Sequence, residues 1–345
     1  MLTILALIKL KLITIKFCIL HVVFRVDSNK RIGLGHLNRC LSIAKSLKLK
    51  GVERTFVLLN KYSAILVKSY GHDVVLIQRK NNEISYIKKL IDQKKCHALV
   101  IDSKRKSVSN IVKNFASKTK IVLVDNLKVK NNVNLFILPG AKEQFRQYPT
   151  NSLVGLKYVL INPSFHPTYN QKREKSIFIS FGSSDKHNIT KRVVSAFTKI
   201  KSNFKIIVIL GRFYKQKKDL ESIIKNDKRF VILEDPNNLH EIMAKCSIGI
   251  IAFGITIYEA AFCKLPVFVI SHSNENHISA QKITEYGWSK YLGKYNEINY
   301  LSVAKTIIST ANDEVLLKKM IDNAKLIDGK GSVRIADTII KLIQN

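Results

Sequence analysis

The chain has 345 residues, a length typical of two α/β domains, and its 46% hydrophobic content excludes a fibrous or largely disordered protein. Its 58 basic and 25 acidic residues give a net charge of +33. The lysines are spread from end to end, with no helix-turn-helix pattern or aromatic-rich basic strand, so a nucleic-acid partner is not expected, whereas an anionic substrate or membrane surface suits the charge.

Residues 1–20 form an apolar segment that Lys9, Lys11 and Lys16 interrupt. Three interpretations stay open: a start site assigned too far upstream, an extension packed beside the first strand, or a helix lying in a membrane interface. No small-residue cleavage site follows, and the five cysteines are scattered without a C-x-x-C pair. We therefore predict a cytoplasmic protein that is at most peripheral at the inner face of a membrane.

From residue 21 onward, short and nearly continuously apolar runs alternate with helical patterns, as in parallel sheets covered by helices on both faces. An N-terminal Rossmann-like domain is predicted over 21–161. Its strands are expected within 21–26, 55–60, 73–77, 98–102, 120–125, 135–139 and 158–162. Its helices are expected at 37–50, 83–95 and 110–118.

A polar segment with two prolines, 162–175, is predicted to link this domain to a second Rossmann-like domain over 176–345. The second series of strands is expected within 176–182, 205–211, 229–235, 248–254 and 266–271. Helices are expected at 188–200, 238–246, 256–264 and 278–286, with a closing helix at 332–345. The predicted fold class is α/β, with two doubly wound domains facing across a cleft that holds the ligand at the carboxyl ends of their strands.

The first motif, R-V-D-S-N-K-R-I-G-L-G-H-L-N-R over 25–39, runs from the first strand into the first helix. Gly33 and Gly35 allow a tight turn and a close approach of substrate, and His36 falls at the helix start. Arg39 lies one turn further on the same helix face. The alternative is a glycine-rich turn with a capping histidine and a surface arginine.

Two further turns follow strands of the second domain. In F-G-S-S-D over 181–185, Gly182 and Ser183 are expected to let backbone amides and the next helix N-terminus face a pyrophosphate, although a plain turn would have the same residues. In A-F-G-I-T-I-Y-E-A over 252–260, Thr256 follows Gly254 and can cap a helix. Glu259, three residues on, either completes a capping box or binds ligand.

The last motif is S-N-E-N-H over 273–277, after the strand at 266–271. It contains Asn274, Asn276 and His277, three polar side chains suited to hydrogen bonding with a sugar or a phosphate. Helix capping by Asn274 is the alternative function of this segment. No H-x-E, D-x-D or paired His-Cys spacing is present, so neither a metal nor a cofactor is expected.

The string over 25–39, together with the segments at 153–165, 178–190 and 252–277, resembles the UDP-sugar hydrolases of the pseudaminic acid pathway and their spore-coat polysaccharide relatives. These are similar in fold to the peptidoglycan N-acetylglucosaminyltransferase, which implies the B-type glycosyltransferase fold. The resemblance implies that His36 is the general base for water attacking the anomeric carbon of a UDP-sugar, without a metal. Its string also assigns Arg25 and Asp27 to the substrate site.

Further roles follow from the same resemblance. Glu259 would accept hydrogen bonds from the ribose hydroxyls, and Asn276 with His277, or Asn274 one position away, would reach the sugar or the phosphates. Asp102 would orient His36 or bind sugar. The chain departs from the hydrolases after Asp102, since their Asp-His-Tyr is Asp102-Ser-Lys104 here.

Three functions are therefore weighed. A UDP-amino-sugar hydrolase for surface-glycan precursors comes first, an inverting glycosyltransferase using the same donor second, and a non-catalytic nucleotide-sugar-binding protein third. A UDP-sugar is the expected partner in all three, and the sequence does not indicate an oligomeric state.

Overall fold

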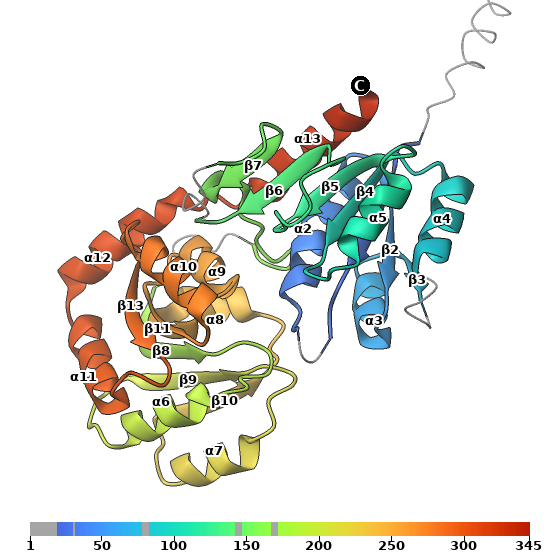
Figure 1. Cartoon of the computed structure of the whole chain (residues 1–345). Coiled ribbons are helices and arrows are strands. Elements are labelled where there is room, and N and C mark those ends of the chain that lie inside the picture. The colour runs from blue at the N-terminus through green and yellow to red at the C-terminus, as the bar shows by residue number, and fades with distance from the viewer. Residues whose placement is uncertain (1–18, 30–31, 78–82, 142–146, 167–171) are drawn as a thin grey trace, which may run out of the picture.

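The computed structural model describes residues 19–29, 32–77, 83–141, 147–166 and 172–345. Within them, two parallel sheets each carry helices on both faces, and the two α/β units lie side by side (Figure 1). The predicted fold class of two doubly wound domains is confirmed. Each unit forms because nearly continuous apolar strands, such as His21–Val26, can be buried on both faces only beneath two layers of helices.

The first sheet has a doubly wound strand order. Its strands are, across the sheet, β3 (Asp73–Leu76), β2 (Glu53–Leu58), β1 (His21–Val26), β4 (Ala98–Asp102), β5 (Lys120–Val124), β6 (Leu135–Pro139) and β7 (Ser152–Gly155). Its helices are α2 (Gly35–Leu49), α3 (Lys61–Ser69), α4 (Glu83–Lys94) and α5 (Val108–Phe115). The direction of winding reverses between β1 and β4, so a crevice is expected at the carboxyl ends of these two strands.

The second sheet repeats this arrangement. Its strands are, across the sheet, β10 (Phe230–Glu234), β9 (Lys205–Leu210), β8 (Glu174–Ser180), β11 (Cys246–Ala252), β12 (Val267–Ser271) and β13 (Ser289–Lys294). Its helices are α6 (Ile189–Thr198), α7 (Lys217–Ile224), α8 (Leu239–Lys245), α9 (Thr256–Phe262), α10 (Asn274–Thr284), α11 (Tyr300–Ala311) and α12 (Glu314–Asn323). Here the reversal lies between β8 and β11.

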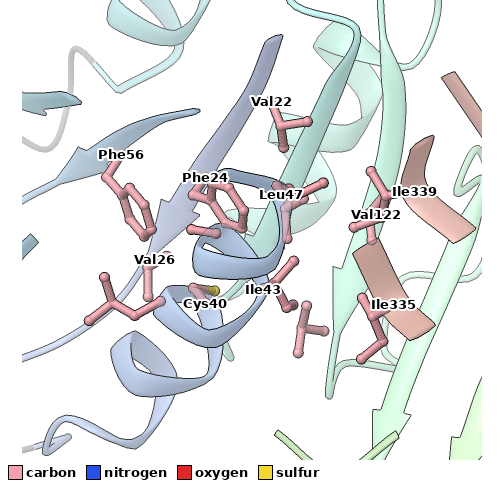
Figure 2. Close-up of a cluster of buried hydrophobic side chains, with 14 of the residues drawn as sticks. Val22, Phe24, Val26, Cys40, Ile43, Leu47, Phe56, Val122, Ile335 and Ile339 are labelled. Carbon is pink, nitrogen blue, oxygen red and sulfur yellow. The ribbon is translucent and has the colours of Figure 1, made fainter. Parts of the chain in front are cut away.

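The last helix, α13 (Gly331–Gln344), crosses back to the first domain. Ile335 and Ile339 are fully buried in the same cluster as Val22, Phe24 and Leu47, beneath α2 (Figure 2). The prediction of a closing helix is confirmed. Its inclusion in a domain over 176–345 is corrected, because its apolar face packs on the N-terminal core.

The strand predicted at 158–162 is not present. The strand of this region is β7, which ends at Gly155 with φ 102, and residues 156–158 form a single 3-10 turn. Val159 and Ile161 are buried in a cluster of the second domain, whereas Leu160 is buried in the first. The run is apolar because it passes between two hydrophobic cores. A buried strand has the same composition, so the sequence alone does not distinguish the two.

Candidate functional site

A cavity of about 580 Å³ opens between the two domains. Both domains contribute to its wall, and most of its lining residues lie at, or in the loops and helices after, the carboxyl ends of strands, as expected for paired doubly wound sheets. The polar members are Arg39, Lys104 and Asp125 from the first domain and Asn276 and Ser279 from the second. The apolar members include Pro139, Val159, Leu160, Phe253, Tyr258 and Ile278.

His36 lies in the first turn of α2 and contacts Asp102, the last residue of β4. The distance from His36 Nδ1 to Asp102 Oδ1 is 2.5 Å, and the Asp102 side chain is almost fully buried. A carboxylate at this distance favours the tautomer in which Nδ1 carries the proton and donates it in a hydrogen bond. Nε2 is then the nitrogen with a free lone pair, so the pair has the arrangement of an oriented general base.

Arg39, one turn along α2, fixes the carboxylate of Asp102. Its Nε and Nη2 donate to the two oxygens of Asp102 over 3.0 and 2.9 Å, and its Nη1 donates to Asp125 over 3.2 Å. Burial by itself lowers the pKa of Arg39, but the two carboxylates outweigh burial and raise it. Arg39 therefore stays charged and holds Asp102 in position for His36.

Asp125 was not singled out from the sequence. It comes directly after β5, with φ 52, whereas Asp102 is the last residue of the neighbouring β4, and Lys104 pairs with Asp125 over 3.3 Å. Carboxylates at the carboxyl ends of two adjacent parallel strands are a signal that the sequence did contain. Lys104, at the position where the hydrolases have tyrosine, thus presents an ion pair to the cavity.

Arg25 and Asp27 do not line the cavity. Their side chains are 1% and 4% exposed, and they pair with each other over 3.0 Å. Arg25 also bonds Glu83, and Asp27 bonds Arg105 and Ser103 of the loop after β4. The structure therefore places this pair beneath the loop that carries Lys104, where it can position the site without touching substrate.

The two glycine turns predicted from the sequence lie close together across the domain boundary. Gly33 has φ 82, and a Cβ built on it would lie 3.2 Å from Oγ of Ser183. Gly182, also with φ 82, and Gly35, at the start of α2, have open space at the corresponding position. A side chain at Gly33 would therefore narrow the gap between the turns.

The N-terminus of α6, the helix after Gly182 and Ser183, is less available for binding a phosphate than the sequence predicted. Asp185 is buried, and its carboxylate accepts hydrogen bonds from the amides of Ile189 and Thr190 over 3.0 and 2.8 Å. These amides at the N-terminus of α6 already have an anionic partner. A phosphate here would rely on the turn itself and not on this helix terminus.

The turn after β11 places Gly254 in the cavity wall and Glu259 in the interior. The N-cap of α9 is Ile255, with no side-chain cap, so Thr256 does not cap the helix and the capping-box interpretation of Glu259 is wrong. Glu259 is 4% exposed and accepts a hydrogen bond from the backbone amide of Asn162. Burial raises its pKa to about 7, and that hydrogen bond opposes the rise.

The three residues predicted in the segment after β12 lie in different surroundings, and only one of them lines the cavity. Asn276 lines the cavity, and its Nδ2 donates to the carbonyl of Phe253 over 3.4 Å. His277 bonds Tyr291 through Nδ1 over 2.7 Å, within the second domain. Asn274 is exposed at the start of α10, and the cap of this helix is Ser273, not Asn274.

Tyr258 is a cavity residue that sequence reasoning missed. The amide of Ala141, from the first domain, donates to its hydroxyl over 3.1 Å. Gly140, with φ 98, allows this approach, because a Cβ there would lie 2.3 Å from the Tyr258 hydroxyl. An aromatic residue of α9 thus joins the two domains beside the cavity.

The described ranges of the chain contain neither a metal-binding cluster nor a membrane-spanning helix. No group of three His, Cys, Asp or Glu side chains there could hold a metal ion. In the same ranges, no helix combines the length and the apolar character needed to cross a membrane.

The profile of the family described as "Glycosyl transferases group 1" matches residues 162–327. An uncharacterized protein of Methanocaldococcus jannaschii is 24% identical over 72% of this chain, and the chain spans only 55% of that relative. The spore coat polysaccharide biosynthesis protein SpsG of Bacillus subtilis is 22% identical over 92% of this chain and 96% of its own length. The UDP-2,4-diacetamido-2,4,6-trideoxy-beta-L-altropyranose hydrolase of Campylobacter jejuni is 23% identical over 78% and 98%.

Solved structures agree on the architecture. MurG of Acinetobacter baumannii superposes with a TM-score of 0.70 over 93% of this chain and 99% of its own, at 12% identity. The S. aureus MnaA–UDP co-structure has a TM-score of 0.65 over 94% and 98%, at 15% identity. The chain has the B-type glycosyltransferase fold, and the predicted resemblance to the spore-coat and UDP-sugar hydrolase proteins is confirmed.

Proposed function

We propose that this protein binds a UDP-sugar in the cavity between its domains and hydrolyses it at the anomeric carbon, supplying free amino-sugar for a surface glycan. The observation that carries the proposal is the His36–Asp102 contact of 2.5 Å beside the cavity. It supplies an oriented base where a nucleotide sugar would meet water. The name of the Campylobacter relative supports a UDP-amino-sugar as substrate, and that of the Bacillus relative supports a role in polysaccharide biosynthesis.

In the proposed reaction, Nε2 of His36 takes a proton from water while the water oxygen attacks the anomeric carbon. The bond from that carbon to the diphosphate oxygen breaks, and its electron pair leaves with UDP. Asp102 stabilises the imidazolium that forms, and Arg39 holds Asp102 in place through two hydrogen bonds. A base of this kind contributes about 10²–10⁴-fold to the rate.

The nucleotide would lie mainly on the second domain. We assign the diphosphate to the turns that contain Gly182, Ser183 and Gly254. The resemblance implies that Glu259 binds the ribose hydroxyls, and its buried carboxyl, which is outside the cavity lining, would have to become accessible to the nucleotide on binding. Asn276 would reach the sugar, since it lines the cavity opposite Arg39 and Lys104 of the first domain. Thr256 would contact a phosphate from the first turn of α9.

A glycosyltransferase is the second candidate, favoured by the group 1 glycosyltransferase match over 162–327. In that case an acceptor hydroxyl replaces water, and His36 removes its proton. The apolar lining, which includes the half-exposed Ile278, would suit an acceptor with an apolar part.

Incubation with a panel of UDP-amino-sugars tests the proposal, with UDP release and the fate of the sugar followed by mass spectrometry and NMR. We expect free sugar and UDP from the wild type. His36→Asn should lower turnover by about 10²-fold or more while UDP affinity stays nearly unchanged, because the base acts on water. His166→Asn, an exposed histidine outside the cavity, is the matched control. UDP release that requires an added acceptor would support the transferase. If His36→Asn loses UDP affinity as strongly as it loses turnover, His36 is not the base.

A further inference from the structure

Two histidines that the proposed reaction does not use lie together at the carboxyl edge of the second sheet. His187 belongs to the loop between β8 and α6, and His272 follows β12. Their ring centroids are 6.2 Å apart and their planes are inclined by 26°. His187 also packs on Tyr295, which follows β13, with centroids 4.3 Å apart.

We propose that His187 and His272 form a clamp that closes on the diphosphate of the bound nucleotide by taking up a proton. The inference rests on the proposed function and adds to it a pH-dependent component of nucleotide binding and release. Both residues lie in the segments 178–190 and 252–277 that carry the family resemblance, but neither is among the site residues predicted from the sequence.

The position of the pair supports a contact with the nucleotide. His187 is in the same loop as Gly182 and Ser183. β11, whose turn contributes Gly254 to the cavity wall, lies between β8 and β12 in the sheet. The two histidines therefore come from the loops on either side of the Gly254 turn, at the point where the winding of the sheet reverses, and ligands bind to doubly wound sheets at this point.

A chain of hydrogen bonds also connects His272 to the cavity. Nδ2 of Asn276 lies 3.1 Å from Nε2 of His272 and 3.4 Å from the carbonyl oxygen of Phe253. Asn276 and Phe253 both line the cavity. A change in the charge of His272 is therefore transmitted to groups that would contact the ligand.

The charges around the pair favour an anion. Lys186 precedes His187, and the Arg192 guanidinium of α6 lies over the rings of Tyr295 and Tyr300, at 5.7 and 5.9 Å. The acidic group that acts on His272 is Asp185, whose carboxylate is already bonded to two amides of α6. Two fixed cations against one carboxylate leave a positive surplus before either histidine is protonated.

Burial, and then the nearby His187, lower the pKa of His272. A diphosphate reverses this by favouring the charged form. Binding should then be coupled to proton uptake, and affinity should rise as the pH falls through the range in which His272 of the complex takes up its proton.

Calorimetric titration with UDP at about pH 6 and about pH 8, in buffers of different ionisation enthalpy, measures both affinity and proton uptake. UDP itself titrates near the lower value, so UDP-glucose, with no titrating phosphate in this range, is the second probe and uridine the control without phosphate. We expect the wild type to bind the diphosphate ligands about tenfold more tightly at the lower pH, with net proton uptake.

The double variant His187→Gln and His272→Gln should lose this pH dependence with UDP-glucose and take up fewer protons than the wild type with UDP. His166→Gln, at an exposed histidine away from the pair, should keep both. The two single variants, each checked by melting temperature, serve if the double variant does not fold. A double variant that keeps the wild-type dependence, or uridine that shows it too, overturns the clamp while leaving the proposed function intact. Absence of UDP binding at every pH would instead overturn the proposed function itself.

Discussion

At His36, the chemistry depends on a side-chain contact between residues 66 positions apart. The sequence could predict its two ends, because a histidine after a glycine turn and an aspartate ending a strand both lie at the carboxyl edge of a parallel sheet. It could not predict that Arg39 joins Asp102 to Asp125, because side-chain direction after a strand depends on local backbone, such as φ 52 at Asp125.

The direction of the Arg25 side chain was not predicted from the family motif. Along β1, Val22 and Phe24 face the cluster beneath α2, whereas Val23 faces the opposite layer. Alternation puts Arg25 with Val23, on the side away from His36, where it meets Glu83. The family motif includes Arg25, but the pleat of the strand directs its side chain beneath the site.

Glu259 should make the fold less stable as the pH rises. A carboxyl whose pKa rises from 4.5 in the unfolded chain to about 7 in the fold favours the folded state in its neutral form, so that stability is fully present below about pH 4.5 and is lost between there and about pH 7. Glu259→Gln, neutral at every pH, should match the wild type in acid and be more stable by about 3 kcal/mol at pH 8.

Denaturant unfolding of both proteins at several pH values measures this difference. If the carboxylate accepts the ribose hydroxyls, the same variant should bind UDP about 10-fold or more weakly. A variant that is less stable than the wild type at pH 8 and binds UDP normally would mean that Glu259 is structural.

At the scale of elements, the strand positions followed from apolar runs, but the partner of each element did not. The pattern at 332–345 predicted an amphipathic helix correctly, and the same apolar face could have packed on either sheet. The apolar run at 159–161 was wrongly predicted to be part of a strand for a related reason. A segment buried between two cores has the same apolar composition as a buried strand. The strands β7 and β13 and the helices α3, α7, α11 and α12 were not predicted. Partly exposed positions weaken the apolar signal of β7, β13, α7 and α12, but not of α11, which buries five of its residues.

Substitutions in α13 should therefore destabilise the N-terminal domain. Ile339 is fully buried against the α2 layer, so Ile339→Ala should cost about 2–5 kcal/mol. Val333→Ala, at a 42% exposed position of the same helix, should change stability by about 0.5 kcal/mol or less. Hydrogen exchange should show the lost protection first in α2 and β1, and loss confined to the strands of the second sheet would contradict the packing of α13 on the first.

At the scale of the whole molecule, the two domains meet at several points around the cavity. Arg212 lies over the ring of Tyr62 at 4.7 Å, and Tyr258 contacts Ala141. These contacts, the two glycine turns and the cavity all lie in the chain beyond residue 18. Leu20 directly precedes β1, and its carbonyl accepts a hydrogen bond from the amide of Glu53.

A shortened chain beginning at Ile19 should therefore keep the melting temperature, UDP affinity and turnover of the full chain. From its charge of +33 we expect the full chain to bind vesicles that contain phosphatidylserine. The shortened chain should bind them too, because removing Lys9, Lys11 and Lys16 leaves most of that charge. It should weaken with salt, since the screening length falls from about 10 Å at 0.1 M to about 3 Å at 1 M.

Co-sedimentation with vesicles and turnover of a soluble UDP-sugar, each measured for both chains, separate the interpretations of residues 1–20. Binding that resists salt and disappears in the shortened chain would identify an interfacial membrane segment. Loss of turnover on the soluble substrate would mean that the segment belongs to the catalytic domain. Loss of turnover only toward a lipid-linked acceptor would favour the transferase over the hydrolase, because hydrolysis of a soluble nucleotide sugar does not require a membrane.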